Sequence, residues 1–214
     1  LEKEIGDILT RTHLKLEPSL FEADVFNVET QNEYLRAWFA PTARRQLLCY
    51  LSLIPNYRYQ DVLKIILSRS ARSARLTTHF DLDFPKKPQT TPYHCYKHGR
   101  TCLPTDDALQ FLDRYSLDTL RRIKEFSAIR TDASVTIIRG DAREVAFPPI
   151  DFAITSPPYV GLIDYHDQHR YAYELLGLPR NDQLEIGAAL NGSSKRAKEA
   201  YIADISKVFS NVRR

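Results

Sequence analysis

Two consecutive prolines, Pro157 and Pro158, follow a short apolar run at residues 150–154 of this 214-residue chain. An apolar run of this length that ends near proline is typical of a buried β-strand. Because proline donates no backbone hydrogen bond and cannot continue a central strand, the chain must leave the sheet here. Ligands of open α/β sheets bind beyond the carboxyl ends of the strands. The sequence therefore predicts that Ser156 and Tyr159, which flank the prolines, lie at a ligand-binding edge.

The segment from Ser156 to Tyr159 suits a flat substrate that carries an amine. An amine on an aromatic ring is a poor nucleophile because its lone pair is delocalised into the ring. Two fixed oxygens that accept its N–H groups would make the nitrogen more reactive. The Ser156 hydroxyl and the Pro157 carbonyl are the candidate acceptors, and the Tyr159 ring would stack on a flat substrate. A Pro-Pro turn beside an incidental tyrosine is the alternative interpretation.

The sequence Ser156-Pro157-Pro158-Tyr159 resembles the catalytic motif of DNA amino-methyltransferases, which reads Ser/Asp/Asn-Pro-Pro-Tyr/Phe. The serine form is typical of the N4-cytosine branch. The resemblance implies that these four residues are catalytic. It also implies transfer of a methyl group from S-adenosylmethionine (SAM) to the exocyclic amine of a flipped-out DNA base. Cytosine N4 is the first expectation and adenine N6 the next.

The resemblance extends to Gly140-Asp141-Ala142, because amino-methyltransferases often carry Gly-Asp-Ala or Gly-Asp-Ser at the end of the strand before the catalytic one. In that family the acidic residue contacts the adenine amine of SAM. The resemblance thus implies that Asp141 binds the cofactor, with Ala142 and Thr155 beside it. An Asx turn, which Gly-Asp favours in any protein, is the alternative interpretation.

The resemblance covers about residues 134–176 and lacks one major part of the family pattern. The chain has seven glycines, and no two are spaced to form a glycine-rich cofactor loop such as Phe-x-Gly-x-Gly. The acidic residue that grips the ribose is missing as well, and the chain contains no methionine. We therefore expect a fragment whose cofactor motif lies upstream. The remainder of the methyltransferase chain or a second subunit would complete the site.

The spacing of apolar residues divides the chain into three expected regions. Residues 1–75 are predicted to be helical, and residues 76–132 to form a loop-rich and helical insert that serves as a possible DNA-recognition segment. Residues 133–214 are expected to form the catalytic part. The expected fold class is α/β: part of a Rossmann-like methyltransferase sheet with a large, mainly helical N-terminal region.

Within these regions, helical spacing is clearest at residues 33–54, where Pro41 either begins or kinks a helix. The first helical run is expected to end at Pro18. Short β-branched or apolar runs predict strands at residues 135–138 and 152–155, as a hairpin or as parallel neighbours; the resemblance favours the parallel arrangement. Further helices are expected near residues 61–75, 108–115, 116–126, 165–176 and 197–212.

Two sets of basic residues are candidates for contact with DNA. Arg69, Arg72 and Arg75 are spaced by three and share one face of a predicted helix, where arginine forks would match phosphate oxygens. A solvated basic face is the alternative for this stripe. Lys97 and Arg100 lie in a loop-rich segment with several tyrosines, a composition that suits nucleic acid and also an ordinary surface loop.

A possible metal site lies in the same loop-rich segment. Cys95, His98 and Cys102 offer soft ligands at short spacing, and His94 or His79 would complete a set of four. The spacing does not match a standard pair of ligand knuckles, and reduced, buried cysteines are the commoner outcome. We therefore expect no metal, with zinc as the alternative.

Net charge and hydrophobicity give only general information about the class of protein. A net charge of +3 does not by itself indicate a nucleic-acid partner, and no apolar run is long enough to span a bilayer. We expect DNA as a partner, no membrane, and a location in a prokaryotic-type cytosol or nucleoid. A non-catalytic or truncated nucleic-acid-binding module related to these enzymes is the alternative function.

Overall fold

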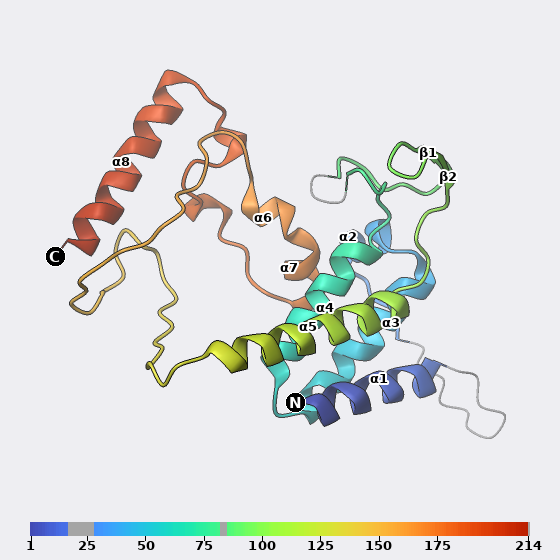
Figure 1. Cartoon of the computed structure of the whole chain (residues 1–214). Coiled ribbons are helices and arrows are strands. Elements are labelled where there is room, and N and C mark those ends of the chain that lie inside the picture. Colours follow the sequence, from blue (N-terminus) through green and yellow to red (C-terminus); the bar gives the residue numbers. More distant parts are fainter. Residues whose placement is uncertain (17–27, 82–84, 214) are drawn as a thin grey trace. The chain divides into compact units, whose positions relative to one another are not determined.

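The computed structural model describes residues 1–16, 28–81 and 85–213 (Figure 1). These residues form two compact units. The first comprises Leu1–Arg130 with Arg170–Leu178, and the second comprises Thr131–His169 with Pro179–Arg214. The first unit therefore joins the regions expected at residues 1–75 and 76–132, and also takes a short piece from the expected catalytic part.

The first unit is built mainly of helices, because its apolar residues recur at helical spacing. Proline at the first turn of a helix loses no hydrogen bond, and Pro41 begins a helix as expected. The predicted helix at residues 33–54 is two helices, since Phe39 and Ala40 before Pro41 adopt non-helical backbone angles. The helices of this unit are α1 (Glu2–Leu16), α2 (Glu33–Trp38), α3 (Pro41–Leu53), α4 (Gln60–Ala74), α5 (Leu109–Ile129) and α7 (Arg170–Leu176), with a 3-10 turn at Ile54–Asn56.

Two expected helix boundaries differ from the structure or lie outside it. Residues 108–126 were expected to form two helices, with a new start at Ser116, but α5 runs through without interruption. The Ser116 side chain is fully buried, so it does not act as a cap. The helix end expected at Pro18 lies outside the described residues; α1 ends at Leu16.

The core of the first unit lies among its helices. Each helix contributes fully or almost fully buried apolar side chains, and each large aliphatic side chain removed from water contributes about 1.5–3 kcal/mol. The core residues include Ile5 and Ile8 of α1, Leu35 of α2, Leu47 and Tyr50 of α3, Leu63, Ile66 and Leu67 of α4, Leu112 of α5, and Tyr171 and Leu175 of α7.

A small antiparallel hairpin projects from the loop-rich segment of the first unit (Figure 1). Strands β1 (Tyr93–Cys95) and β2 (Arg100–Cys102) pair with Tyr93 opposite Cys102 and Cys95 opposite Arg100. Gly99 in the connecting turn has φ +60°, a conformation that favours glycine. Among the described residues these are the only two strands, so the observed fold is mixed: helices with one small sheet.

The second unit contains a long terminal helix, α8 (Lys195–Val212), and a short one, α6 (Tyr165–Gln168). Two 3-10 turns lie between these helices, at Asp182–Leu184 and Ala189–Asn191. None of the helices in the described part of the chain is long and apolar enough to cross a membrane.

The prediction of strands at residues 135–138 and 152–155 is wrong for this structure, in which neither segment forms a strand. A strand exists only where a neighbour supplies the other half of its hydrogen-bond ladder. Within the described ranges no such neighbour is paired with either segment. Their apolar side chains lie in solvent instead, with Ile137 90% and Ile154 102% exposed.

Candidate functional site

The Ser156–Tyr159 motif lies at the surface of the second unit. Ser156 and Pro157 are exposed, and Thr155 before them is exposed too. Pro158 is half-buried, and its carbonyl accepts a 2.9 Å hydrogen bond from the hydroxyl of Tyr201 in α8. The Tyr159 side chain is 60% exposed, so its ring is open to a flat partner. The motif is thus fixed at Pro158, while the residues on either side face solvent.

Glycines fix the chain that follows the motif. Gly161 has φ +70°, and its amide donates a 2.8 Å hydrogen bond to the carbonyl of Gly187. A Cβ atom on Gly161 would lie 2.6 Å from the carbonyl oxygen of Gly192, so only glycine fits there. Gly187 and Gly192 therefore lie close against the chain that leaves the motif.

Asp141 lies in an ion pair with Arg143. Nε of Arg143 lies 2.9 and 3.0 Å from the two carboxylate oxygens, and Nη2 lies 2.6 Å from Oδ2. The backbone amide of Arg143 also donates to Oδ1, at 2.9 Å, which makes the Asx turn considered as the alternative for Gly-Asp. Hydrogen bonds from Arg143 hold the pKa of Asp141 below its usual value. The carboxylate that was expected to contact SAM is therefore already bound by its own neighbour.

Helix α8 connects this ion pair to the rest of the unit. Nη1 of Arg143 lies 3.1 Å from the carboxylate of Asp204. The side-chain amide of Asn211 donates to the carbonyls of Ala142 and Val145, at 3.1 and 2.8 Å. Ala142, expected beside the cofactor, is thus held through its backbone.

Three polar side chains of α8 therefore hold the two sequence motifs. Tyr201 binds the Pro158 carbonyl, Asp204 binds Arg143, and Asn211 binds the Ala142 carbonyl. At about 100° per residue, positions 201, 204 and 211 share one face of a helix. The sequence predicted this helix but not its role. The signal that was missed is the helical spacing of Tyr201, Asp204 and Asn211, which places three polar side chains on one face.

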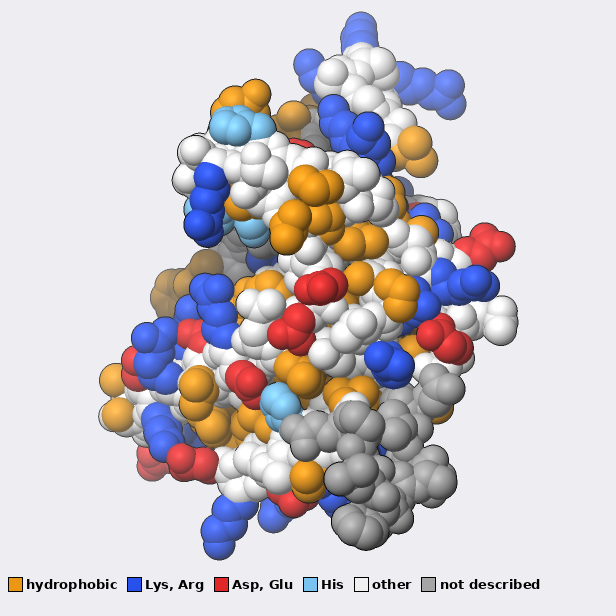
Figure 2. Space-filling model, turned by 90° about the vertical axis from the view of Figure 1, so that its right-hand side faces the viewer, with side chains coloured by type: hydrophobic (Ala, Val, Ile, Leu, Met, Phe, Trp, Pro, Cys, Tyr) orange, Lys and Arg blue, Asp and Glu red, His pale blue; other side chains and the backbone are white. Residues whose placement is uncertain are grey.

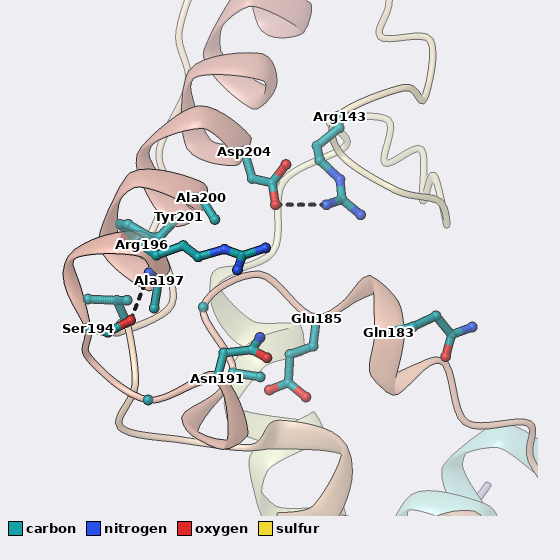
Figure 3. A pocket seen from close by; sticks show the side chains of 14 residues that line it. Arg143, Gln183, Glu185, Asn191, Ser194, Arg196, Ala197, Ala200, Tyr201 and Asp204 are labelled. Carbon is teal, nitrogen blue, oxygen red and sulfur yellow. Dashed lines mark hydrogen bonds and ion pairs between the residues drawn. The ribbon is translucent and has the colours of Figure 1, made fainter.

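A cavity of about 400 Å³ opens beside α8 (Figure 3). Its volume is within the range of small-molecule sites. Figure 3 shows the Arg143–Asp204 pair and the side chain of Arg196 near its rim. The lining also includes Val160, the residue after the motif, but none of the four motif residues. The charged lining therefore lies next to the motif rather than within it.

The arginine stripe is only partly exposed on the first unit. The Arg75 side chain is 2% exposed, and its guanidinium lies 4.5 Å from the centre of the Tyr171 ring. Burial lowers the pKa of Arg75. Arg72 is half-buried.

Arg69 is engaged in the same way. Its Nη2 lies 2.5 Å from Asp118 of α5, and its guanidinium lies over the ring of Tyr115. The expectation of an exposed stripe is wrong for Arg75, which is buried. Arg69 is partly exposed and paired with Asp118, so its contact with phosphate stays a prediction. The reason is tertiary: α5 and α7 pack against this part of α4.

Lys97 and Arg100 are exposed on the hairpin, as a nucleic-acid surface requires. Tyr96 beside them is 85% exposed. Figure 2 shows lysine and arginine side chains scattered over one face of the molecule, among acidic and hydrophobic ones. The structure therefore keeps these two basic residues as candidates for contact with a polyanion.

The chain is 46% identical over 200 residues to a protein named Type II methyltransferase M.MjaII, from Methanocaldococcus jannaschii. It is similar to part of a methyltransferase. The match covers 85% of this chain and 38% of that protein, so the chain spans well under half of the relative's length. No family model matches the chain, and no solved structure matches it. The similarity supports the resemblance to DNA methyltransferases.

Proposed function

We propose that this chain is part of a DNA methyltransferase that transfers a methyl group from SAM to the exocyclic amine of a flipped-out base. Cytosine N4 is the first candidate and adenine N6 the second. The observation that carries the proposal is the 46% identity to a methyltransferase along a chain that contains Ser156-Pro157-Pro158-Tyr159. The exposure of Ser156, Pro157 and Tyr159 supports it, because a base in contact with these residues would need open access.

In this proposal the motif residues act on the base. The Ser156 hydroxyl and the Pro157 carbonyl accept the two N–H groups of the amine, which favours the tetrahedral nitrogen. Tyr159 stacks on the flipped base. The hydrogen bond from Tyr201 to the Pro158 carbonyl limits rotation of the turn, so the two acceptor oxygens keep their positions. SAM would supply the electrophilic methyl group and leave as S-adenosylhomocysteine, while the amine would lose one proton to solvent.

The residues expected to hold SAM fit it only in part. Asp141 offers a carboxylate, but four hydrogen-bond contacts from Arg143 already use its oxygens. A carboxylate has about four lone-pair sites, so a further donor must displace one of these contacts. We therefore propose that Asp141 binds the adenine amine only when Arg143 gives up one of its hydrogen bonds to the carboxylate. Ala142 and Thr155 would lie beside the cofactor.

A Rossmann-like sheet is proposed for residues 135–138 and 152–155. The side chains of Val135 and Phe152 are 82% and 89% exposed, although β-branched and aromatic residues of this kind are usually buried in strands. Strands from the remainder of a methyltransferase chain, or from a second subunit, would cover these side chains and complete the ladder. This partner would also supply the glycine-rich cofactor loop.

For DNA contact we propose Lys97 and Arg100 on the hairpin, with Tyr96 as a stacking side chain. Arg69 and Arg75 are not part of this proposal, because they are engaged inside the first unit. Arg72 is half-buried and is not included either.

Methyl transfer from labelled SAM to duplex DNA tests the proposal, with the full-length protein as the enzyme. The modified nucleoside identifies the base: N4-methylcytosine is expected, and N6-methyladenine would support the second candidate. Tyr159→Ala is expected to abolish transfer, while Tyr59→Ala, in the helical unit, serves as the control. A full-length protein that binds DNA but transfers no methyl group would favour the alternative, a non-catalytic nucleic-acid-binding module. The ion pair that occupies the Asp141 carboxylate is the observation in favour of that alternative.

A further inference from the structure

The loop-rich segment of the first unit contains a cluster of four side chains with metal-ligating atoms. His79, Cys95, His98 and Cys102 each place one such atom within 4.8 Å of all the others. The sequence pointed to three of these residues and left the fourth open between His79 and His94. The structure brings in His79, and His94 lies next to Cys95 on the opposite face of β1.

The hairpin geometry explains why the two cysteines meet. Tyr93 pairs with Cys102 and Cys95 pairs with Arg100, so both cysteines lie on the same face of the ladder, diagonal to each other. The turn through Gly99 returns His98 towards that face. His79, which precedes the hairpin in the chain, reaches the same point, where the Tyr93 hydroxyl accepts a 3.1 Å hydrogen bond from its backbone amide.

The distances match tetrahedral coordination. The Sγ atom of Cys95 lies 3.5 Å from Nδ1 of His79 and 3.6 Å from Nδ1 of His98. Nδ1 of His98 lies 3.4 Å from Sγ of Cys102. With Zn–S of about 2.3 Å and Zn–N of about 2.0–2.1 Å, tetrahedral angles separate sulfur from nitrogen by about 3.6 Å. The cluster is therefore already close to the size of a zinc-ligand shell.

Thiol–imidazole hydrogen bonds account for these contacts less well. Nδ1 of His98 lies close to both sulfur atoms, but an imidazole nitrogen either donates one hydrogen or accepts one. The single S–H of Cys95 can serve only one of its two histidine contacts, so its sulfur, a weak acceptor, would have to accept in the other. One cation at the centre satisfies all four atoms at once.

The segment also needs a stabilising element of this kind. Among the described residues, the hydrophobic core takes no member between Ala74 and Ala108. The large apolar side chains of this stretch are mostly in solvent: Phe80 is 81% and Leu103 71% exposed. An isolated two-stranded hairpin is only marginally stable in water. Cys95 and Cys102 are nevertheless buried, with exposed fractions of 2% and 8%. The buried part of this segment is therefore the cluster itself.

We propose that His79, Cys95, His98 and Cys102 bind one structural zinc ion. Two thiolates and two imidazoles are a common ligand set for structural zinc, and four protein ligands leave no open position for a substrate. The ion ties three short pieces of chain together, and so holds the turn that carries Lys97 in place. This inference does not depend on the proposed methyl transfer.

Metal content of the full chain, purified without chelator, tests the site. One zinc per chain is expected by plasma mass spectrometry, and the Cys102→Ser and His79→Gln variants are expected to lose it. His94→Gln, in the same strand, is the matched control and should keep its zinc. Helical circular dichroism should be unchanged in all three variants, because the core of the helices lies elsewhere. Zinc retained by Cys102→Ser, or lost by His94→Gln alone, would overturn the assignment.

Two measurements on the unmodified chain keep the test independent of variant folding. Replacement of zinc by Co²⁺ should give the intense visible absorption of a tetrahedral thiolate site. Cys95 and Cys102 should react with a thiol reagent only after a chelator is added, as seen by peptide mass spectrometry. A chain that holds no metal after reconstitution with zinc, or in which the two cysteines react without chelator or form a disulfide, contradicts the proposal.

Discussion

The Tyr201 hydroxyl donates a hydrogen bond to the Pro158 carbonyl across 43 positions of sequence, at 2.9 Å. Proline fixes only φ, so a turn of two prolines still has freedom about ψ. The bond from Tyr201 removes part of that freedom next to the two oxygens proposed to accept the amine. Tyr201 is therefore a positioning residue in the proposed reaction: it contacts the turn and not the base.

Tyr201→Phe is expected to lower kcat for methyl transfer about twofold to tenfold, because a hydrogen bond of this kind contributes about 0.5–1.5 kcal/mol. KM for DNA should stay the same, since the hydroxyl does not touch the duplex. Single-turnover and steady-state rates on duplex DNA measure both quantities. Tyr59→Phe is the control, and equal rates for Tyr201→Phe and wild type would show that the bond does not position the turn.

Substitutions at Asp141 and Arg143 should have opposite effects on SAM binding. Asp141→Ala removes the proposed acceptor for the adenine amine, so SAM affinity should fall by about tenfold or more. Arg143→Gln frees the carboxylate of its ion pair, so affinity should stay equal or rise. Calorimetric titration of the full-length protein with SAM separates the two. A loss of affinity that is the same in both variants would indicate that the ion pair itself, rather than a free Asp141, supports the site.

Lys97→Ala with Arg100→Ala should flatten the salt dependence of DNA binding. Each phosphate contact contributes about one unit to the slope of log K against log salt, so the slope should fall by about two. Arg75→Ala is the internal comparison, since its buried guanidinium lies over the Tyr171 ring. It should leave the slope unchanged and lower the free energy of unfolding, by roughly 1–3 kcal/mol. A reduced slope in Arg75→Ala would indicate that the arginine stripe contacts DNA phosphates.

The ion pairs of Asp118 predict a pH effect on stability. Hydrogen bonds from Arg69 and Arg122 hold the pKa of Asp118 well below its usual value. A carboxylate whose pKa is lowered by folding stabilises the fold above its unfolded pKa of about 4, and loses that contribution as the pH falls through the folded value. The stability difference between wild type and Asp118→Asn should be constant near neutral pH and shrink below about pH 4.

Urea unfolding followed by circular dichroism across this range measures the difference. Asp61→Asn is the control, because the Asp61 side chain is 94% exposed and its pair with Lys64 is a weak surface contact. A stability difference for Asp118→Asn that persists unchanged at low pH would mean that packing, rather than charge, accounts for it.

Local features of the fold could be predicted from the sequence. Helical spacing and proline placement located α3, α4 and α8, because those signals come from neighbouring residues. The strands at residues 135–138 and 152–155 could not be settled in this way. A strand depends on a partner that is remote in sequence, so the residue pattern alone gives only a candidate.

The candidate site shows the same limit. The pattern identified Ser156 to Tyr159 and Asp141 but not Tyr201 or Asn211, which are many positions away. The pattern also placed Arg75 at the surface. Spacing by three predicts which residues share a helix face, but it does not predict whether another helix covers that face. Conversely, only the fold decided between His79 and His94 for the cysteine cluster, since His79 lies 16 positions from Cys95.

The dependence of both motifs on α8 has a consequence for how the protein is made. Asn211 holds Ala142 across 69 positions of sequence, and Tyr201 holds Pro158 across 43. During translation both motifs therefore leave the ribosome well before the helix that anchors them. A nascent chain that stops before residue 201 presents Ser156 to Tyr159 on an untethered loop. Synthesis of α8 is thus the step after which both segments can be held in place.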